Sequence, residues 1–239
     1  MTQTESYTQK VFNIVHANQI ELAIDLVRSL NNKKLFEELL KDCTIFSDAH
    51  IYHKGLIISP NTNHGGPDLR KFYLELISCC PVEANIHKSI RRENVNALIL
   101  CQLESFENLQ VLSCFTNLTS LEISSNNLFD LNGLATLTKL TSLRICSDAL
   151  YDISLVGNLL NLTNISIVSN SLMNVDALSN LHNLIKLNIQ CWSMENFDGL
   201  TLLGLTKLNS LNLQCKSATN IDSLKKFLPN VKISYLLSS

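Results

Sequence analysis

Four side chains that could ligate a metal or transfer protons lie close together, at Asp48, His50, His53 and His64. Imidazole and carboxylate groups bind zinc, and histidine titrates near neutral pH. Their spacing matches no metal motif, because HIYH is not HExxH and a strand would point His50 and His53 to opposite faces. We therefore expect surface histidines. An enzymatic or metal-binding domain within residues 44–80, targeted by the rest of the chain, is the alternative.

The sequence carries no motif of a common hydrolytic or nucleotide-binding enzyme. A G-x-S-x-G nucleophile turn, a Walker loop and a glycine-rich dinucleotide turn are all missing. Gly65 and Gly66 precede a proline in a segment typical of a loop, so we do not expect them to hold a phosphate. We predict a protein that is not an enzyme and that uses no cofactor and no metal.

Composition and charge narrow the class of partner. The 239 residues carry a formal net charge of −2, from 19 basic and 21 acidic side chains. No basic stripe is present, so nucleic acid is a poor candidate. The polar start MTQTESYTQK lacks the apolar core of a signal peptide, and no apolar run is long enough to span a membrane. We expect a cytoplasmic monomer that binds neither nucleic acid nor a membrane.

A leucine period of 22 residues organises the second half of the chain. Leu118, Leu140, Leu162 and Leu184 each open a phrase similar to LTSLEISSN, and a fifth copy opens at Leu208 after a longer spacer. A period of this length with the lettering LxxLxLxxN is typical of leucine-rich repeats. Such solenoids present an extended concave surface, which predicts a binding protein.

Each repeat is predicted to form one short strand and then return along the opposite side. Alternate side chains of a strand point to opposite faces, so Leu121 and Ile123 point inward. No repeat can bury its own apolar edge, so neighbouring repeats must stack. The leucines that follow the strand recur at the spacing of short helical or 3-10 turns: Leu128, Leu131, Leu134 and Leu137.

The same frame predicts about six repeats over residues 95–239. The fold class is an α/β repeat solenoid, a horseshoe or arc with a parallel, concave β-sheet. The first repeat is degenerate and contributes Val95, Leu98 and Leu100, followed by Phe106, Leu109, Leu112 and Phe115. A last strand, VKISY from Val231 to Tyr235, is expected to close the sheet.

The outward positions of the strands form the predicted partner-binding surface. They are polar, nearly neutral and poor in aromatic side chains, which suits hydrogen-bonded recognition of a protein partner. Arg144 beside Glu122 is the most distinctive charged spot. The predicted binding residues are Ser120, Glu122, Ser124, Ser142, Arg144, Cys146, Asn164, Ser166, Lys186, Asn188, Gln190, Asn212 and Gln214.

The turn after each strand holds a polar residue in the first three regular repeats, Asn126, Asp148 and Asn170. An asparagine amide both donates and accepts, so we expect it to satisfy buried backbone groups at the turn. Trp192 and Lys216 occupy this position in the next two repeats. We expect Trp192 to fill the core, with a binding anchor at the rim as the alternative.

Eight cysteines invite a disulfide or zinc interpretation, but their spacing favours neither. No CxxC pair occurs, and free cysteine behaves as a small apolar residue, so we expect reduced thiols. Cys191 and Cys215 share one position in neighbouring repeats, which we assign to the concave face. Two reduced surface thiols are expected there, and a redox-sensitive or metal-collecting pair is the alternative.

The repeat region resembles the 22-residue leucine-rich-repeat class shared by bacterial internalin-like proteins and the phosphatase-regulator-like family. The shared pattern, LxxLxLxxNxLxDLxxLxxLxxL, appears here as LTSLEISSNNLFDLNGLATLTKL and LTNISIVSNSLMNVDALSNLHNL. The resemblance covers residues 95–239. It implies a leucine-rich-repeat fold that acts through protein–protein contacts.

The first 94 residues show no such period and are predicted to form a mainly helical cap or a small α+β domain. Two amphipathic helices are expected at residues 17–31 and 33–43, joined by the turn signal Asn31-Asn32. One or two short strands should follow in TIFSDAHIYHKGLIISP, then a loop at residues 61–68 and a helix beginning at Asp68. The block resembles, more loosely, the helical lead-in of some intracellular bacterial repeat proteins.

Deleting residues 1–94 tests whether this block is a cap. The deletion should expose Val95, Leu98 and Leu100 at an uncovered solenoid end, where apolar patches and open strand edges promote association. We expect aggregation or loss of soluble expression, measured by size-exclusion chromatography. A truncated protein that remains monomeric with an unchanged melting temperature would make the block an independent domain.

Overall fold

The computed structural model describes residues 3–16, 19–40, 43–45, 51–53, 56–57, 95–100 and 106–237. The chain divides into two compact units, Met1–Ala97 and Leu98–Ser239. The loop predicted at residues 61–68 and the helix predicted after it lie outside the described residues.

Among the described residues of the first unit are the α-helices α1 (Gln3–His16), α2 (Ile20–Leu30) and α3 (Lys33–Leu40). Helices α2 and α3 confirm the predicted helical pair. Asn31 ends α2 in the left-handed conformation, at φ 39°, which asparagine tolerates better than most residues. The Asn32 side chain then accepts hydrogen bonds from the N–H groups of Lys34 and Leu35, at 3.0 and 3.3 Å. This cap starts α3 directly after the turn.

Helix α1 is absent from the sequence-based prediction because its residues are mostly polar. It packs against both α2 and α3 through a narrow apolar stripe. Val11 and Val15, one helical turn apart, are fully buried on that stripe.

A small antiparallel sheet follows, with strand order β1 (Cys43–Ile45), β2 (Ile51–His53) and β3 (Leu56–Ile57). Cys43 pairs with His53, and Tyr52 pairs with Ile57. The predicted β segment is therefore present, with three strands in place of one or two.

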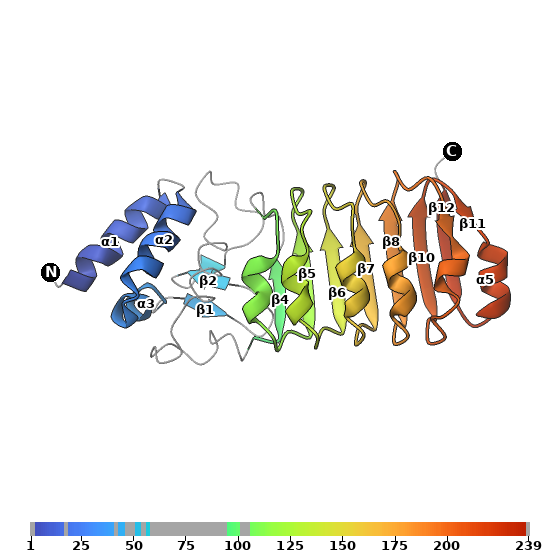
Figure 1. Cartoon of the computed structure of the whole chain (residues 1–239), viewed down its shortest axis with the longest axis horizontal. Coiled ribbons are helices and arrows are strands. Elements are labelled where there is room, and N and C mark those ends of the chain that lie inside the picture. Colours follow the sequence, from blue (N-terminus) through green and yellow to red (C-terminus); the bar gives the residue numbers. More distant parts are fainter. Residues whose placement is uncertain are drawn as a thin grey trace. The chain divides into compact units, whose positions relative to one another are not determined.

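The second unit is built on a parallel sheet of seven strands, with order β12-β10-β8-β7-β6-β5-β4 (Figure 1). Sequential repeats are therefore neighbours in space, as a solenoid requires. The strands are β4 (Ala97–Leu100), β5 (Ser120–Ser124), β6 (Ser142–Cys146), β7 (Asn164–Val168), β8 (Lys186–Cys191), β10 (Ser210–Cys215) and β12 (Lys232–Leu237).

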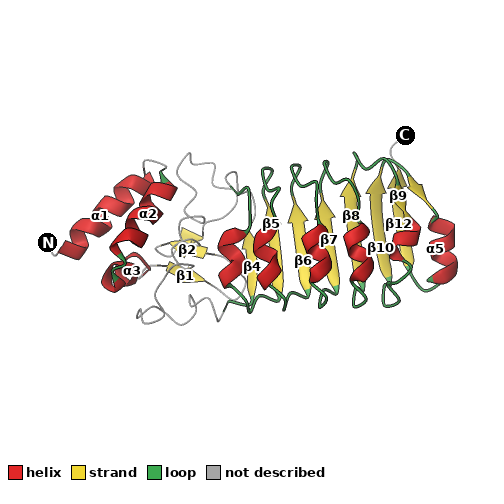
Figure 2. Ribbon diagram, in the orientation of Figure 1, coloured by secondary structure: helices red, strands yellow, loops and turns green. Residues whose placement is uncertain are grey.

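Short helices return the chain along the other side of the repeats, as Figure 2 shows. They are η3 (Gln110–Cys114), η4 (Asn132–Thr136), η5 (Ser154–Asn158), η6 (Asp176–Asn180), η7 (Gly199–Leu202) and the α-helix α5 (Ile221–Phe227). Packing between them is tight. A Cβ on Gly133 would lie 1.7 Å from the Leu109 carbonyl oxygen, so only glycine fits there.

The inward leucines form the core, as the period predicted. Leu118, Leu121 and Ile123 are buried, and so are the equivalent residues of the later repeats. The degenerate first repeat is also confirmed, because Val95, Phe106 and the residues predicted with them are buried. The closing strand pairs in parallel with β10, although it begins at Lys232 and extends to Leu237.

The expected role of the turn asparagines is wrong. Asn126 and Asn170 are exposed, and the Asn170 amide donates to the Asp148 carboxylate, at 2.9 Å, on the surface. The serine one position earlier is buried in each of these repeats. The reason is strand alternation, which continues inward from Leu121 and Ile123 to the next odd position.

Three buried serine hydroxyls donate hydrogen bonds to backbone carbonyl groups, which the apolar leucine side chains cannot do. Each donates to a backbone oxygen of the preceding return segment: Ser125 to Phe106 at 2.8 Å, Ser147 to Leu128 at 2.7 Å, and Ser169 to Leu150 at 2.5 Å. A buried carbonyl without a partner costs about 1–3 kcal/mol, so this row links each repeat to its neighbour.

The spacer between Leu184 and Leu208 is irregular, because these residues lie 24 positions apart instead of 22. Here β9 (Phe197–Asp198) pairs in parallel with β11 (Ala218–Thr219) and forms a separate two-stranded sheet. Phe197 is buried, and the Asp198 carboxylate accepts a hydrogen bond from the Leu200 N–H at 2.9 Å, which caps η7.

Replacement of one buried serine measures the contribution of this row. Ser169→Ala should lower the free energy of unfolding by about 1–3 kcal/mol, because the Leu150 carbonyl loses its partner. Asn170→Ala is the matched control, and its exposed position should limit the change to about 0.5 kcal/mol. Urea unfolding followed by circular dichroism would measure both. A larger effect at Asn170 than at Ser169 would contradict this assignment.

Candidate protein-binding surface

The outer face of the seven-stranded sheet carries side chains in three columns, in the predicted register. In the central column Glu122 pairs with Arg144, and Arg144 with Ser166. Asn188 and Asn212 continue the same column on β8 and β10. All the predicted binding residues lie in these columns, exposed or half-buried, while the residues between them are buried. Their role in binding a partner stays a prediction.

Polar contacts link the central column from strand to strand. The Arg144 Nε lies 3.2 Å from the Glu122 Oε1, and both side chains are largely exposed, so this pair adds at most about 1 kcal/mol. The Asn188 amide donates to the Ser166 hydroxyl at 2.9 Å, and the Asn212 amide donates to the Asn188 amide oxygen at 2.7 Å. The amides are therefore held in fixed orientations.

Strand β12 extends this face beyond the residues chosen from the sequence. Ser234 continues the central column beside Asn212, and Leu236 lies beside Gln214. Leu236 is 58% exposed, which makes it an apolar point at the end of a polar column. The prediction missed it because the strand was expected to end at Tyr235.

The assignment of two cysteines to the exposed face is wrong. Cys191 and Cys215 are paired residues of β8 and β10, as expected, but both are buried in the core. Cys191 occupies the position of the buried serines, and its thiol donates to the Leu172 carbonyl at 3.3 Å. The Cys215 thiol donates to the Ser217 carbonyl at 3.1 Å. Alternation from Leu187 explains the inward direction.

Burial also sets the chemistry of the Cys215 thiol. It raises the pKa of the Cys215 thiol, and the neighbouring Cys191 raises it further. A thiol with a raised pKa holds little thiolate at neutral pH and is a poor nucleophile and metal ligand. Both cysteines are free of disulfides. Cys191 therefore replaces a buried serine, whereas the Cys215 thiol bonds to a carbonyl within its own turn.

The structure describes one of the four residues that could ligate a metal or transfer protons. His53 ends strand β2, while Asp48, His50 and His64 lie outside the described residues. Within the described segments, no group of three or more His, Cys, Asp or Glu side chains converges in a way that would hold a metal ion.

Trp192 is half-buried at its turn. Across the same segments, no helix has the length and apolar character that a membrane span requires.

One group of exposed apolar side chains was not predicted from the sequence. Phe129, Tyr151 and Met173 occupy the same position in three successive repeats and are 45%, 51% and 73% exposed. Each of them directly follows the buried leucine of its turn, at a position for which the repeat motif specifies no residue type. Their alignment only becomes visible once the register is known.

The architecture resembles solved leucine-rich-repeat proteins of bacteria. An internalin of Listeria monocytogenes matches 62% of this chain over 43% of its own length, with 24% identity and a TM-score of 0.51. Internalin C2 of the same organism matches 70% of this chain over 84% of its own, with 14% identity and a TM-score of 0.45. A leucine-rich-repeat protein of Leptospira interrogans matches with 15% identity, over 64% of this chain and 46% of its own, and a TM-score of 0.43.

The chain spans less than half the length of the first of these structures. That likeness shows the leucine-rich-repeat fold, in which parallel strands alternate with short helical returns. Stacked repeats of this kind create extended surfaces. No protein-family model and no curated protein matches the sequence.

Thiol reactivity distinguishes the buried cysteines from the exposed face. In the folded protein at pH 8, iodoacetamide should label Cys146, which is half-buried on the face, well before Cys191 and Cys215. Peptide mass spectrometry after timed labelling would measure the order. After unfolding in urea all three should react alike. Rapid labelling of Cys191 in the folded protein would show that the register of β8 is wrong.

Proposed function

We propose that the second unit recognises a protein partner on the outer face of its seven-stranded sheet, and that the protein acts as a cytoplasmic monomer. The composition and cysteine spacing of the chain favour this location. The extended face formed by stacked repeats is the surface that solenoid proteins commonly use for binding.

The chemistry of the face favours a polar partner surface. Its three columns hold mostly serine, asparagine and glutamine side chains, with one ion pair at Arg144 and Glu122 and a single exposed lysine, Lys186, in the first column of β5 to β10. Large aromatic anchors are missing from these columns. Recognition would depend on hydrogen bonds arranged at the spacing of the strands, about 4.8 Å.

The hydrogen-bonded series Ser166–Asn188–Asn212 is the observation that carries the proposal. It crosses three neighbouring strands and fixes the direction in which each amide presents its remaining polar atoms. An oriented amide loses little side-chain entropy when a partner binds, which favours affinity from a polar surface. The adjacent Arg144 supplies the charge that would set the orientation of the partner.

Substitution on this face tests the proposal. Arg144→Glu combined with Asn188→Ala should sharply reduce capture of the partner, because it reverses the charge and interrupts the amide series. The immobilised intact chain and the variant would be compared in pull-downs from a cell extract, with mass spectrometry of the bound proteins. A partner that depends on the face should be retained by the intact chain and lost from the variant.

Lys207→Glu is the matched control, because it makes the same charge change on an exposed residue in the loop before β10. It should retain the partner. Melting curves of both variants should overlap with that of the intact chain. Equal retention of every bound protein by the double variant would exclude the sheet face as the site.

A further inference from the structure

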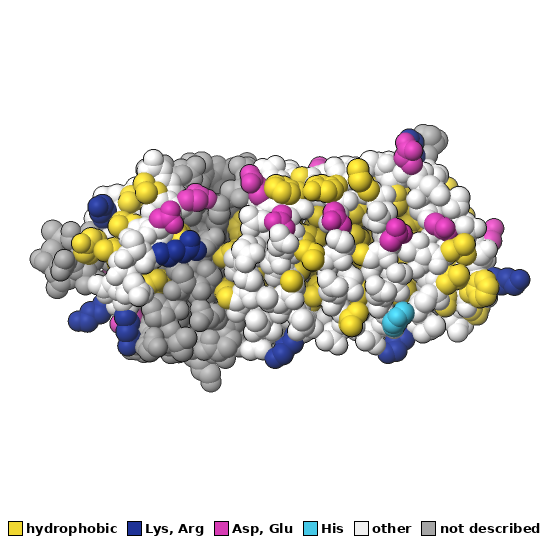
Figure 3. All heavy atoms as spheres, viewed as in Figure 1, with side chains coloured by type: hydrophobic (Ala, Val, Ile, Leu, Met, Phe, Trp, Pro, Cys, Tyr) yellow, Lys and Arg dark blue, Asp and Glu magenta, His cyan; other side chains and the backbone are white. Residues whose placement is uncertain are grey.

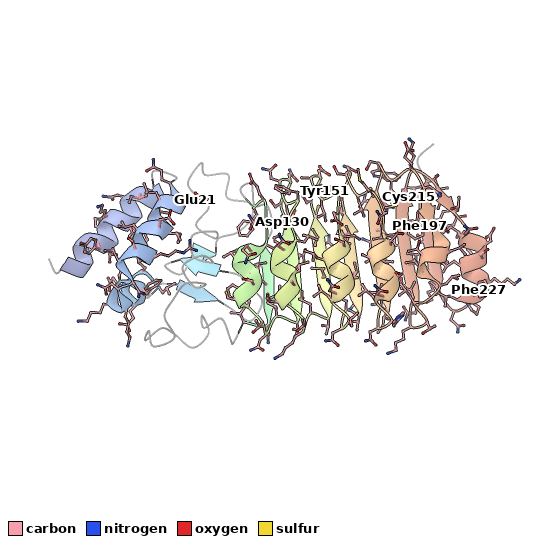
Figure 4. All side chains as sticks on the ribbon, in the orientation of Figure 1. Glu21, Asp130, Tyr151, Phe197, Cys215 and Phe227 are labelled. Carbon is pink, nitrogen blue, oxygen red and sulfur yellow. The ribbon has the colours of Figure 1, made fainter. Side chains whose placement is uncertain are left out.

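The three exposed apolar side chains form a continuous row on one margin of the repeats. This row, defined by Phe129, Tyr151 and Met173, follows strands β5, β6 and β7. Tyr151 and Met173 are neighbours, since the Met173 N–H donates to the Tyr151 carbonyl at 3.3 Å, and Phe129 occupies the equivalent position one repeat earlier. Figure 3 shows hydrophobic side chains aligned along this margin, and Figure 4 places Tyr151 there.

The loops that carry the row are strongly acidic. The segments 125–132, 147–154, 169–176 and 191–198 contain no lysine, arginine or histidine. Their acidic residues are Asp130, Asp148, Asp152, Asp176, Glu195 and Asp198. The loops on the opposite margin, which precede the strands, have the opposite character: residues 136–141, 158–163 and 203–209 contain Lys139 and Lys207 and no acidic residue. The two margins therefore differ in the sign of their charge.

Two of these carboxylates already have a structural role that does not need their charge. Asp130 accepts a hydrogen bond from the Asn132 N–H, and Asp152 from the Ser154 N–H, each at 2.8 Å. Asn108 performs the same capping role in the preceding repeat, where its amide oxygen accepts from the Gln110 N–H at 3.1 Å. Capping is therefore possible without a negative charge. The second oxygens of Asp130 and Asp152 accept from the Asn132 amide and the Ser154 hydroxyl, each at 3.0 Å, and each carboxylate keeps its negative charge for a ligand.

One further carboxylate lies in the same series. Asp198 accepts hydrogen bonds from the Asn220 amide and the Leu200 N–H, which lower its pKa and keep it ionised. The row and its carboxylates thus combine apolar surface with fixed negative charge. Such a surface is complementary to a segment that is both apolar and cationic.

We propose that this margin is a second binding surface, and that it takes a cationic amphipathic helix of a protein partner. The spacing fits: three successive repeats span about 10 Å, at about 4.8 Å for each interval. Residues i and i+7 of a helix are separated by about 10.5 Å, so apolar residues at i, i+3 or i+4, and i+7 can each meet one member of the row. Lysine or arginine side chains beside that stripe would reach Asp130 and Asp152.

This surface goes beyond the proposed function and does not depend on it. The sheet face is polar and pairs Arg144 with Glu122, whereas the margin is apolar and its charged side chains are mainly acidic, with Glu195 paired to Lys216 at 3.6 Å. Variants of one surface can therefore be tested against the other.

A synthetic helix provides the probe. A fluorescein-labelled 20-residue peptide with leucine at i, i+3 and i+7 positions and lysine elsewhere would be titrated with the full chain, using fluorescence anisotropy. A scrambled peptide of the same composition is its control. We expect the amphipathic peptide to bind more tightly than the scrambled one. Added salt should weaken binding but leave this preference in place.

Two variants separate the apolar and charged contributions. The triple change Phe129→Ser, Tyr151→Ser and Met173→Ser should weaken peptide binding at least about tenfold. Asp130→Asn with Asp152→Asn preserves both caps, as Asn108 shows, and should weaken binding several-fold at low salt only. Arg144→Glu with Asn188→Ala, on the sheet face, should leave peptide affinity unchanged. Overlapping melting curves would confirm that every variant is folded.

Four results would overturn the proposal. Equal binding of both peptides, or unchanged affinity in the serine variant, would reduce the effect to general attraction by negative charge. Loss of peptide binding only in the sheet-face variant would move the site to that face. An intact chain that sediments as a dimer, and a serine variant that sediments as a monomer, would show that a second copy of the chain covers the row.

Discussion

The structure of the second unit depends on the burial of one inward column of leucine and isoleucine side chains that no repeat can cover alone. Leu121 and Ile123 leave water only because the next repeat supplies the equivalent Leu143 and Ile145. The buried hydroxyls of Ser125, Ser147 and Ser169 extend this constraint to polar groups, since each satisfies a carbonyl of the preceding return segment. Stacking thus fixes the inward positions and leaves the outer face and the loop margins free to vary.

The sequence predicted the parts of this architecture that repeat. The period of 22 residues located the strands from β5 onward, and strand alternation placed the face residues in register. The prediction did not extend this alternation beyond the last hydrophobic residue of each strand. The alternation continues past Ile123 to Ser125 and past Ile189 to Cys191, which turns both side chains inward and leaves Asn126 exposed. Helix α1 escaped prediction because tertiary packing, through Val11 and Val15, selects it more than its own composition does.

The candidate surfaces were predictable to different degrees for a physical reason. The sheet face follows from the backbone period alone, so each outward residue could be placed before the structure was known. The row of Phe129, Tyr151 and Met173 has no such rule, because a turn position next to a buried leucine tolerates any residue type. These residues can be recognised as one apolar surface only when the register places them in successive repeats, near Asp130 and Asp152. A solenoid can therefore carry distinct surfaces on its face and on its margins, with one core supporting both.

The central claim is that a partner is recognised on the sheet face. The NMR signals of side-chain amides test it most directly. Asn188, Asn212 and Gln190 lie on that face, whereas Asn132, Asn158 and Asn180 are exposed on η4, η5 and η6 along the other side. Two-dimensional NMR spectra of the labelled chain would be recorded as a captured partner is added. The account predicts that the amide signals of Asn188, Asn212 and Gln190 shift or broaden, while those of Asn132, Asn158 and Asn180 stay in place. Changes confined to the second group would contradict it.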